Sequence, residues 1–160
     1  MMKLTNIKRC ITTLLLSLSL LAQAAENKTP PPADEAMKVT YQVINNQTVR
    51  VDIALIKDVY LYKHAFAFTG EDLQVDEQLL TIPAGKEKDD PAFGLVEVYY
   101  GSVSVDVPVN SVGAAPKLKV KYQGCVENFI CYPPQRKTFD LSGQMEEHTS
   151  ELQSRGHLVC

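Results

Sequence analysis

Apolar side chains at every second position give the clearest structural pattern in this chain. The best example runs from Val103 to Val109, where four valines alternate with Ser, Asp and Pro. The segments from Val49 to Leu55 and from Leu118 to Tyr122 alternate in the same way. Because successive side chains of a β-strand point to opposite faces, each segment predicts a strand with one buried face. The sequence has no helical stripe longer than two turns, so it predicts an all-β fold, an antiparallel β-sandwich.

Weaker patterns lie between these strands. Aromatic residues favour strand from Tyr60 to Tyr62 and again from Ala65 to Phe68. Leu79 to Ile82 predicts a further short strand, which would end at the following proline. The stretch from Gly85 to Gly94 reads GKEKDDPAFG and is interpreted as a charged loop.

The first residues of the chain have the three parts of a secretory signal peptide. Basic residues between Lys3 and Arg9 precede the apolar run from Ile11 to Leu21, and Ala22 and Ala24 are the small residues that a signal peptidase recognises. A membrane span takes about 20 residues, so this run is too short and a transmembrane anchor is the weaker alternative. We therefore predict a cleaved signal peptide at residues 1–24 and no membrane span in the mature chain.

The rest of the chain divides into three parts. Residues 25–36 include three consecutive prolines and predict a flexible, extended lead-in. Residues 37–142 contain the strand patterns and form the predicted domain, and residues 143–160 form a polar tail predicted to be disordered. The formal net charge is -3, and the predicted signal peptide carries only basic charges, so the exported part is more acidic. This charge disfavours binding to nucleic acid or to an anionic membrane.

Cys125 and Cys131 lie in the one segment with clear chemical content, YQGCVENFICYPP, at residues 122–134. A glycine before them and two prolines after them favour a turn that brings the two sulfurs together. Closing so short a loop contributes only about 2 kcal/mol by chain entropy. The aromatic residues Tyr122, Phe129 and Tyr132 are placed to shield a reactive sulfur. The residues alone leave a redox-active and a structural disulfide equally open, since spacing does not reveal lability.

The remaining cysteines and the histidines predict no second site. Cys10 falls in the predicted signal peptide, and Cys160 is the last residue and unpaired by count. The three histidines lack ligand spacing, and the sequence has no catalytic triad, phosphate loop or dinucleotide motif. We therefore predict no metal and no bound cofactor. The lysines at positions 117, 119 and 121 favour a solvated strand face, which would attract an acidic redox partner.

The motif YQGC, followed five residues later by CYPP, resembles the active-site segment of a known family. This family is the N-terminal periplasmic (alpha) domain of the thiol:disulfide interchange protein DsbD. The segment from Ile56 to Tyr62 resembles the family's aromatic segment, and the loop ending at Gly94 resembles its cap-loop region. The resemblance covers roughly Val39 to Leu141.

The resemblance implies an immunoglobulin-like β-sandwich in the periplasm, whose paired cysteines cycle between dithiol and disulfide without a bound cofactor. Electrons would come from a thioredoxin-like donor and pass to thioredoxin-fold proteins, namely disulfide isomerases and cytochrome c maturation thioredoxins. By position, Cys131 would form mixed disulfides with partners and Cys125 would resolve them. The residues expected to line or cap the site are Tyr60, Tyr62, Asp90, Ala92, Phe93, Gly94, Phe129 and Tyr132.

The sequence departs from the family pattern in the cap and in its length. Where the family has an acidic-acidic-aromatic-aromatic-Gly cap, this chain has Pro91 in place of an acidic residue and Ala92 in place of an aromatic one. Shielding would then be weaker, unless Phe93 supplies it. The family's membrane and C-terminal domains do not fit within 160 residues, so we expect a separate electron donor, a longer parent chain or a domain with a changed role. The alternative function is a binding module of the same fold with a structural Cys125–Cys131 disulfide.

Overall fold

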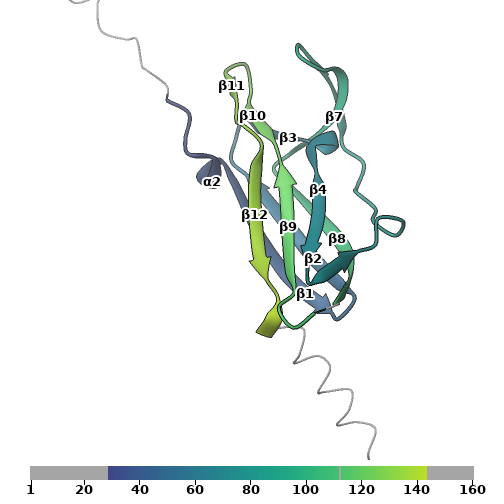
Figure 1. Cartoon of the computed structure of the whole chain (residues 1–160). Coiled ribbons are helices and arrows are strands. Elements are labelled where there is room, and N and C mark those ends of the chain that lie inside the picture. Colours follow the sequence, from purple (N-terminus) through teal and green to yellow (C-terminus); the bar gives the residue numbers. More distant parts are fainter. Residues whose placement is uncertain (1–28, 112, 144–160) are drawn as a thin grey trace, which may run out of the picture.

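A computed structural model describes residues 29–111 and 113–143, and most of them belong to antiparallel β-strands (Figure 1). The predicted all-β class is confirmed. Besides the strands, these ranges contain the short α-helix α2, one turn of 3-10 helix, η1, and helical backbone at residues 142 and 143. In chain order the elements are α2 (Ala33–Ala36), β1 (Met37–Asn45), β2 (Thr48–Leu55), β3 (Val59–Tyr62), η1 (Lys63–Ala65), β4 (Ala67–Glu71), β5 (Leu73–Val75), β6 (Lys86–Asp90), β7 (Gly94–Tyr100), β8 (Ser102–Ser111), β9 (Lys117–Tyr122), β10 (Gly124–Val126), β11 (Ile130–Cys131) and β12 (Gln135–Asp140).

Two sheets form the sandwich. The four-stranded sheet has the order β1-β2-β8-β5 and the three-stranded sheet the order β12-β9-β4, and Figure 1 shows one behind the other. Burying one Val or Leu side chain contributes about 1.5–3 kcal/mol, so the aliphatic core between the sheets is the main source of stability. The alternation predicted from sequence selects the core side chains, which include Val49, Val51, Ile53, Val105, Val107, Leu118 and Val120.

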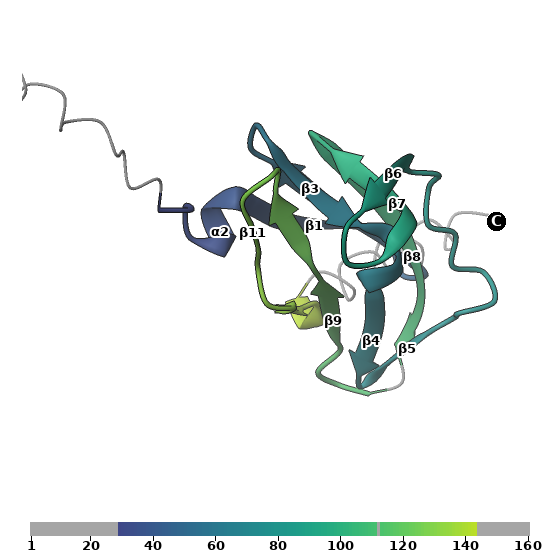
Figure 2. The same ribbon diagram turned by 90° about the horizontal axis from the view of Figure 1, so that it is seen from above.

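A third sheet covers one end of the sandwich, at the top of Figure 1. Its five strands have the order β11-β10-β3-β7-β6, so the hairpins β10–β11 and β6–β7 lie on opposite sides of β3 (Figure 2). The buried residues Tyr60, Tyr62, Val98 and Cys125 form a small cluster here, separate from the main core. We call these four residues the sulfur cluster.

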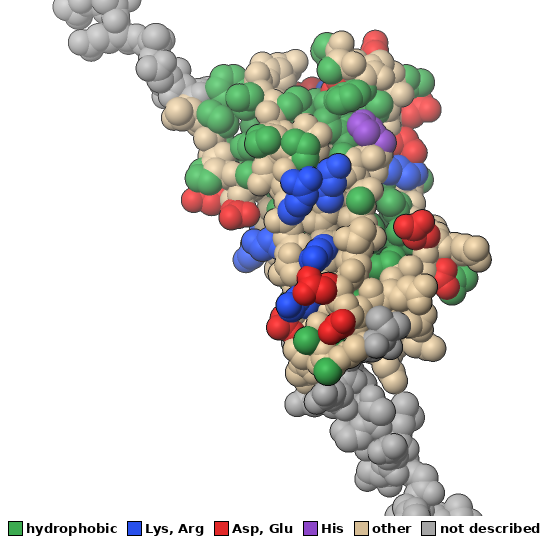
Figure 3. Space-filling view, in the orientation of Figure 1, with side chains coloured by type: hydrophobic (Ala, Val, Ile, Leu, Met, Phe, Trp, Pro, Cys, Tyr) green, Lys and Arg blue, Asp and Glu red, His purple; other side chains and the backbone are tan. Residues whose placement is uncertain are grey.

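The outer face of the sheet β12-β9-β4 is charged, and basic side chains gather in the middle of the face seen in Figure 3. Lys117 and Lys119 of β9 form ion pairs with Glu71 of β4, at 3.3 and 2.7 Å. Lys121, nearer the cysteines in sequence, stands opposite Arg136 of β12 in the strand register. The three lysines therefore occupy one side of β9, while its leucine and valine face the core.

The prediction of a strand from Leu79 to Ile82 is wrong, because the chain turns there instead. The Asp76 carboxylate accepts hydrogen bonds from the N–H groups of Gln78 and Leu79 at 3.0 and 3.3 Å, and its backbone carbonyl accepts one from Leu80 at 3.1 Å. An Asp side chain that bonds the local backbone in this way competes with strand pairing. Leu80 and Ile82 still pack against the main core.

The prediction of a charged loop from Gly85 to Gly94 is also wrong, because more than half of this stretch is strand. Lys86–Asp90 forms β6, which pairs with β7 so that Lys88 stands opposite Val96. β6 is at the edge of its sheet. Charged side chains are common on edge strands because they deter pairing with another chain, so charge alone did not exclude a strand.

The lead-in differs from its prediction at its C-terminal end. Residues Ala33–Ala36 form α2, and Ala36 is completely buried in the main core. The Pro31 carbonyl accepts a hydrogen bond from the Tyr132 hydroxyl at 2.8 Å. The predicted signal peptide and nearly all of the predicted tail lie outside the described residues. Among residues 29–111 and 113–143, no helix has the length and apolar character needed to cross a membrane.

Candidate functional site

The two cysteines lie opposite each other on the short hairpin β10–β11. Phe129 donates its N–H to the Val126 carbonyl at 3.1 Å, which closes the turn, and Asn128 adopts the left-handed conformation (φ 55°) that Asn tolerates well. Cys125 and Cys131 are register partners, and their sulfurs form a disulfide.

Gly124 allows this hairpin to approach β3 closely. A Cβ atom at position 124 would lie 2.5 Å from the Tyr60 carbonyl oxygen and 2.7 Å from the Met37 sulfur, so a side chain does not fit there. Cys125 is paired directly with Tyr60 across the two strands. The glycine that precedes the first cysteine therefore places the disulfide beside the tyrosines of β3.

The two sulfur-bearing residues differ in accessibility. Cys125 is 1% exposed and belongs to the sulfur cluster, whereas Cys131 is exposed on the edge strand β11. Disulfide exchange requires a thiolate to reach a sulfur atom directly. Cys131 is therefore the sulfur that another molecule can attack.

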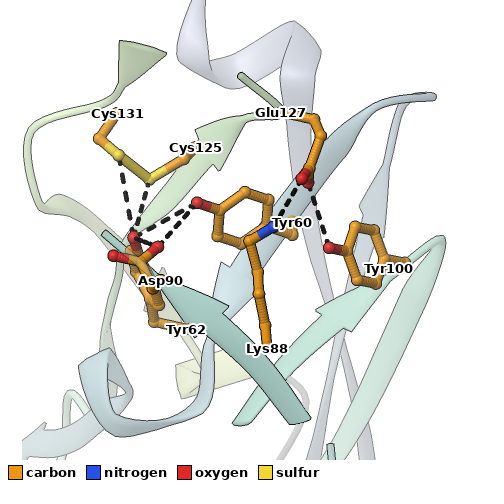
Figure 4. A network of polar contacts seen from close by, with 8 residues as sticks. All are labelled: Tyr60, Tyr62, Lys88, Asp90, Tyr100, Cys125, Glu127 and Cys131. Carbon is orange, nitrogen blue, oxygen red and sulfur yellow. Dashed lines mark hydrogen bonds and ion pairs between the residues drawn. A yellow bond between two sulfur atoms is a disulfide. The ribbon is translucent and has the colours of Figure 1, made fainter. Parts of the chain in front are cut away.

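A buried carboxylate, that of Asp90, organises the polar groups beside the disulfide (Figure 4). The Tyr62 hydroxyl donates to Asp90 Oδ2 at 2.7 Å, and the Tyr60 hydroxyl donates to the same oxygen at 3.0 Å. The Tyr62 hydroxyl oxygen also lies 3.3 Å from Sγ of Cys125 and 3.9 Å from Sγ of Cys131. Tyr62 thus connects the carboxylate to both sulfurs.

Asp90 is only 4% exposed, yet its carboxyl favours the ionised form. Burial alone would raise the pKa of Asp90, but hydrogen bonds from the two tyrosine hydroxyls and from two backbone N–H groups outweigh burial and lower it. Burial is the main reason that the pKa values of Tyr60 and Tyr62 are raised. At neutral pH this hydrogen-bond network therefore contains one carboxylate and two protonated tyrosines.

The turn after Asp90 forms a cap over this network. Asp90 Oδ1 accepts hydrogen bonds from the N–H groups of Ala92 at 2.9 Å and Phe93 at 3.2 Å, and Gly94 (φ 70°) takes a backbone conformation that would strain another residue. The Phe93 ring lies edge-on to Tyr62, with ring centroids 5.2 Å apart, and 5.1 Å from the ring of His64. Phe93, and not residue 92, therefore covers Tyr62.

A second set of contacts joins β6 to the cysteine hairpin, and the sequence analysis did not identify it. Lys88 Nζ forms an ion pair with Glu127 at 2.5 Å and lies 4.7 Å from the centroid of the Tyr60 ring. The Tyr100 hydroxyl donates to the other oxygen of Glu127 at 3.1 Å (Figure 4). Lys88 and Asp90 are two residues apart on β6, so their side chains lie on the same face of the sheet. This spacing was the sequence signal that linked Lys88 to the site.

Comparison with known proteins decides the family. Residues 27–143 match the family model described as thiol:disulfide interchange protein DsbD, N-terminal. The chain belongs to this family. A thiol:disulfide interchange protein DsbD 1 from Pseudomonas aeruginosa is 34% identical over an alignment of 151 residues, and the match covers 85% of this chain and 26% of that protein. The chain thus spans about a quarter of the length of this curated relative.

Two solved structures of Neisseria meningitidis proteins are also similar. One is the DsbD N-terminal domain in the reduced form, with a TM-score of 0.62, 31% identity, and coverage of 76% of this chain and 94% of that chain. The other is a complex between the DsbD N-terminal and PilB N-terminal domains, with a TM-score of 0.56, 29% identity, and coverage of 73% and 89%. The predicted immunoglobulin-like β-sandwich of the family is confirmed by these matches together with the strand arrangement.

Most of the expected site residues lie together. Phe129 is 56% exposed and forms part of a pocket wall with Ala92 and Cys131. Tyr122 and Tyr132 lie elsewhere, since both are buried in the main core. Successive side chains of an extended chain point to opposite sides, so Tyr132 does not share the side that Cys131 faces.

The described ranges contain no cluster of three or more His, Cys, Asp or Glu side chains placed to hold a metal ion. The ionisable groups of the site instead bond to one another, through the tyrosine–Asp90 network and the Lys88–Glu127 pair.

Proposed function

We propose that Cys125 and Cys131 form a redox-active pair, through which the protein relays electrons from a reductant to thioredoxin-fold partners in the periplasm. One observation carries this proposal: an exposed sulfur is bonded to a buried one, beside a buried carboxylate. A purely structural disulfide needs no such arrangement. The predicted signal peptide supports export to the periplasm, and the Neisseria complex supports a protein partner, because it joins a related domain to a second domain.

Reduction begins at the exposed sulfur. A donor thiolate attacks Sγ of Cys131, forms a mixed disulfide with it, and expels Cys125 as a thiolate that takes up a proton. A second thiolate of the donor then attacks the donor's own sulfur in the mixed disulfide. Cys131 is released and protonated, the donor leaves as a disulfide, and the pair has gained two electrons and two protons.

Electron transfer to the acceptor uses the same sulfur. The Cys131 thiolate attacks the acceptor's disulfide, and one acceptor sulfur leaves as a thiolate. Cys125 then attacks Cys131, restores the internal disulfide and releases the acceptor as a dithiol. Cys125 is suited to this second step because it is shielded from other molecules but bonded to Cys131.

The tyrosine–carboxylate network regulates these steps. Ionised Asp90 repels a second negative charge nearby, so it lowers the thiolate fraction of the reduced cysteines while the cap is closed. The Tyr62 hydroxyl donates its hydrogen bond to Asp90, so its oxygen can accept a hydrogen bond from the S–H of reduced Cys125, whose sulfur lies 3.3 Å away. A protein partner that displaces the cap moves Asp90 away and so increases the reactivity of Cys131.

Trapping with single cysteine variants tests the proposal and the role of each sulfur. Cys125→Ser leaves Cys131 without its resolving partner, and we expect it to accumulate a mixed disulfide with an oxidised thioredoxin-fold disulfide isomerase. Cys131→Ser leaves only the 1% exposed Cys125, and we expect little conjugate. Non-reducing electrophoresis and mass spectrometry measure the conjugate, and the double variant is the control.

The two variants also separate the alternatives. If neither variant forms a conjugate and the wild-type disulfide also resists reduction by small thiols, the disulfide is structural and the protein is a binding module. If both form equal amounts, the assignment of Cys131 as the attacking sulfur is wrong.

A further inference from the structure

A pocket of about 290 Å³ lies directly beside the exposed sulfur. The end of β6 and the cap turn form one wall, with Pro91 and Ala92, and the cysteine hairpin forms the other, with Phe129 and Cys131. We call this space the Cys131 pocket. Its volume is at the lower limit of the range usual for small-molecule sites, so it fits a compact ligand.

The cap closes one side of the site and leaves this pocket accessible. Phe93 turns toward Tyr62 and His64 and is not part of the pocket wall. The cap presents Pro91 and Ala92 to the pocket, and the side chain of Ala92 is a single methyl group. Cys131 is exposed while Phe93 still packs on Tyr62, so a small molecule reaches this sulfur without displacing the cap.

The charged groups of the pocket favour a cationic ligand. Lys88 and Glu127 both line it, but they neutralise each other through their ion pair at 2.5 Å. Asp90 also lines it, and its hydrogen-bond donors are neutral hydroxyl and backbone groups. The pocket therefore carries one uncompensated negative charge, which attracts an ammonium group and repels a carboxylate.

We propose that the Cys131 pocket admits low-molecular-weight disulfides that carry ammonium groups, and that the reduced protein reduces them directly. The proposal rests on the redox pair proposed above, and it adds a class of substrate that needs no movement of the cap. The Cys131 thiolate attacks one sulfur of R–S–S–R, which forms a Cys131–S–R mixed disulfide and expels one R–S⁻. Cys125 then attacks Cys131 and expels the second R–S⁻. Two electrons and two protons pass from the cysteines to two molecules of R–SH.

The test compares three small disulfides of different charge with the reduced full chain. The probes are cystamine (cationic), hydroxyethyl disulfide (neutral) and dithiodiglycolate (anionic). Each second-order rate constant is divided by the rate constant of the same probe with dithiothreitol, which removes intrinsic differences between the probes. We expect the corrected rate for cystamine to exceed that for dithiodiglycolate by about fivefold at low salt, and the ratio to fall as salt is added.

Filling the pocket tests its location. Ala92→Phe places a ring in the pocket, and we expect it to slow the reaction with all three probes by about tenfold or more. Ala92→Leu should give a smaller reduction. Leu79→Ala, at an exposed residue outside the pocket, should leave the rates unchanged. Ala92→Leu keeps the test valid if the phenylalanine variant fails to fold.

Three outcomes overturn the proposal: rates that do not change in Ala92→Phe and Ala92→Leu, a wild-type protein that reacts no faster with cystamine than with dithiodiglycolate, or a ratio that is insensitive to salt. The trapping experiment with Cys125→Ser is independent of these rates. Conjugate formation without pocket-dependent rates would reject the small-molecule substrate and keep the protein relay. Pocket-dependent rates without any protein conjugate would keep the small-molecule substrate and reject the protein relay.

Discussion

The main core of the sandwich and the sulfur cluster differ in what they bury. The main core is mostly aliphatic, and two of its tyrosines, Tyr99 and Tyr132, bond backbone carbonyls through their hydroxyls. The sulfur cluster instead buries a sulfur and two tyrosine hydroxyls around the carboxylate of Asp90. The first arrangement contributes free energy of folding, and in the proposed function the second controls the reactivity of the disulfide. Substitutions should therefore separate stability from exchange.

The largest expected effect is on stability, from a substitution in the main core. Leu118→Ala removes a completely buried side chain and should lower the free energy of unfolding by about 2–5 kcal/mol. Urea denaturation followed by circular dichroism measures this loss. Below the transition, the rate of exchange with a protein disulfide should stay at the wild-type value. Leu79→Ala, at a residue that is 69% exposed, is the matched control and should change neither quantity. A slower exchange in folded Leu118→Ala would show that the two regions are not separable.

A substitution where the sulfur cluster meets the cap should have an intermediate effect on stability and should also change the rate of exchange. Tyr62→Phe removes the hydroxyl that bonds Asp90 and contacts both sulfurs, which should cost about 1–3 kcal/mol of stability because a buried acceptor loses a donor. It should also loosen the cap and so speed exchange with a protein disulfide. Tyr60→Phe removes a hydrogen bond to the same carboxylate without a sulfur contact and is the control. Stopped-flow rates of both variants test this, and equal rates would assign no special role to Tyr62.

The smallest expected effect is a change in how stability depends on pH. The pKa of Asp90 is lowered in the folded protein, so its ionised form stabilises the fold above the unfolded pKa of about 3.9. This contribution is lost as pH falls from that value through the lower, folded pKa. Asp90→Asn should therefore flatten the decline in the urea midpoint between pH 5 and the acid limit of folding. An identical decline in the wild type and the variant would mean that other carboxylates cause it.

The sequence predicted the sandwich because period-two alternation is a direct record of which strand faces are buried. The prediction of secondary structure failed between Asp76 and Asp90. There the Asp76 side chain bonds the local backbone, and charged residues form an edge strand. Neither feature leaves an apolar pattern.

In the candidate site, the paired cysteines and the aromatic segment were recognisable as motifs. The Lys88–Glu127 bridge was not, because it joins residues that are distant in sequence and become neighbours only through the order of strands in the third sheet. The position of Tyr132 was misjudged for a related reason. Proximity to Cys131 in sequence suggested a shielding role, whereas its burial in the main core sets its actual surroundings.

The strand register of the cysteine hairpin has a consequence for the lifetime of conjugates. Tyr132 donates its N–H to the Gly124 carbonyl at 2.9 Å, and this bond does not depend on the sulfur–sulfur bond that it flanks. When Cys131 is joined to another molecule, the backbone therefore still holds Cys125 opposite it, at an effective molarity far above the concentration of any competing thiol. Release of the partner should be faster than its capture. Wild-type conjugates would then be scarce at steady state, even during rapid electron flow.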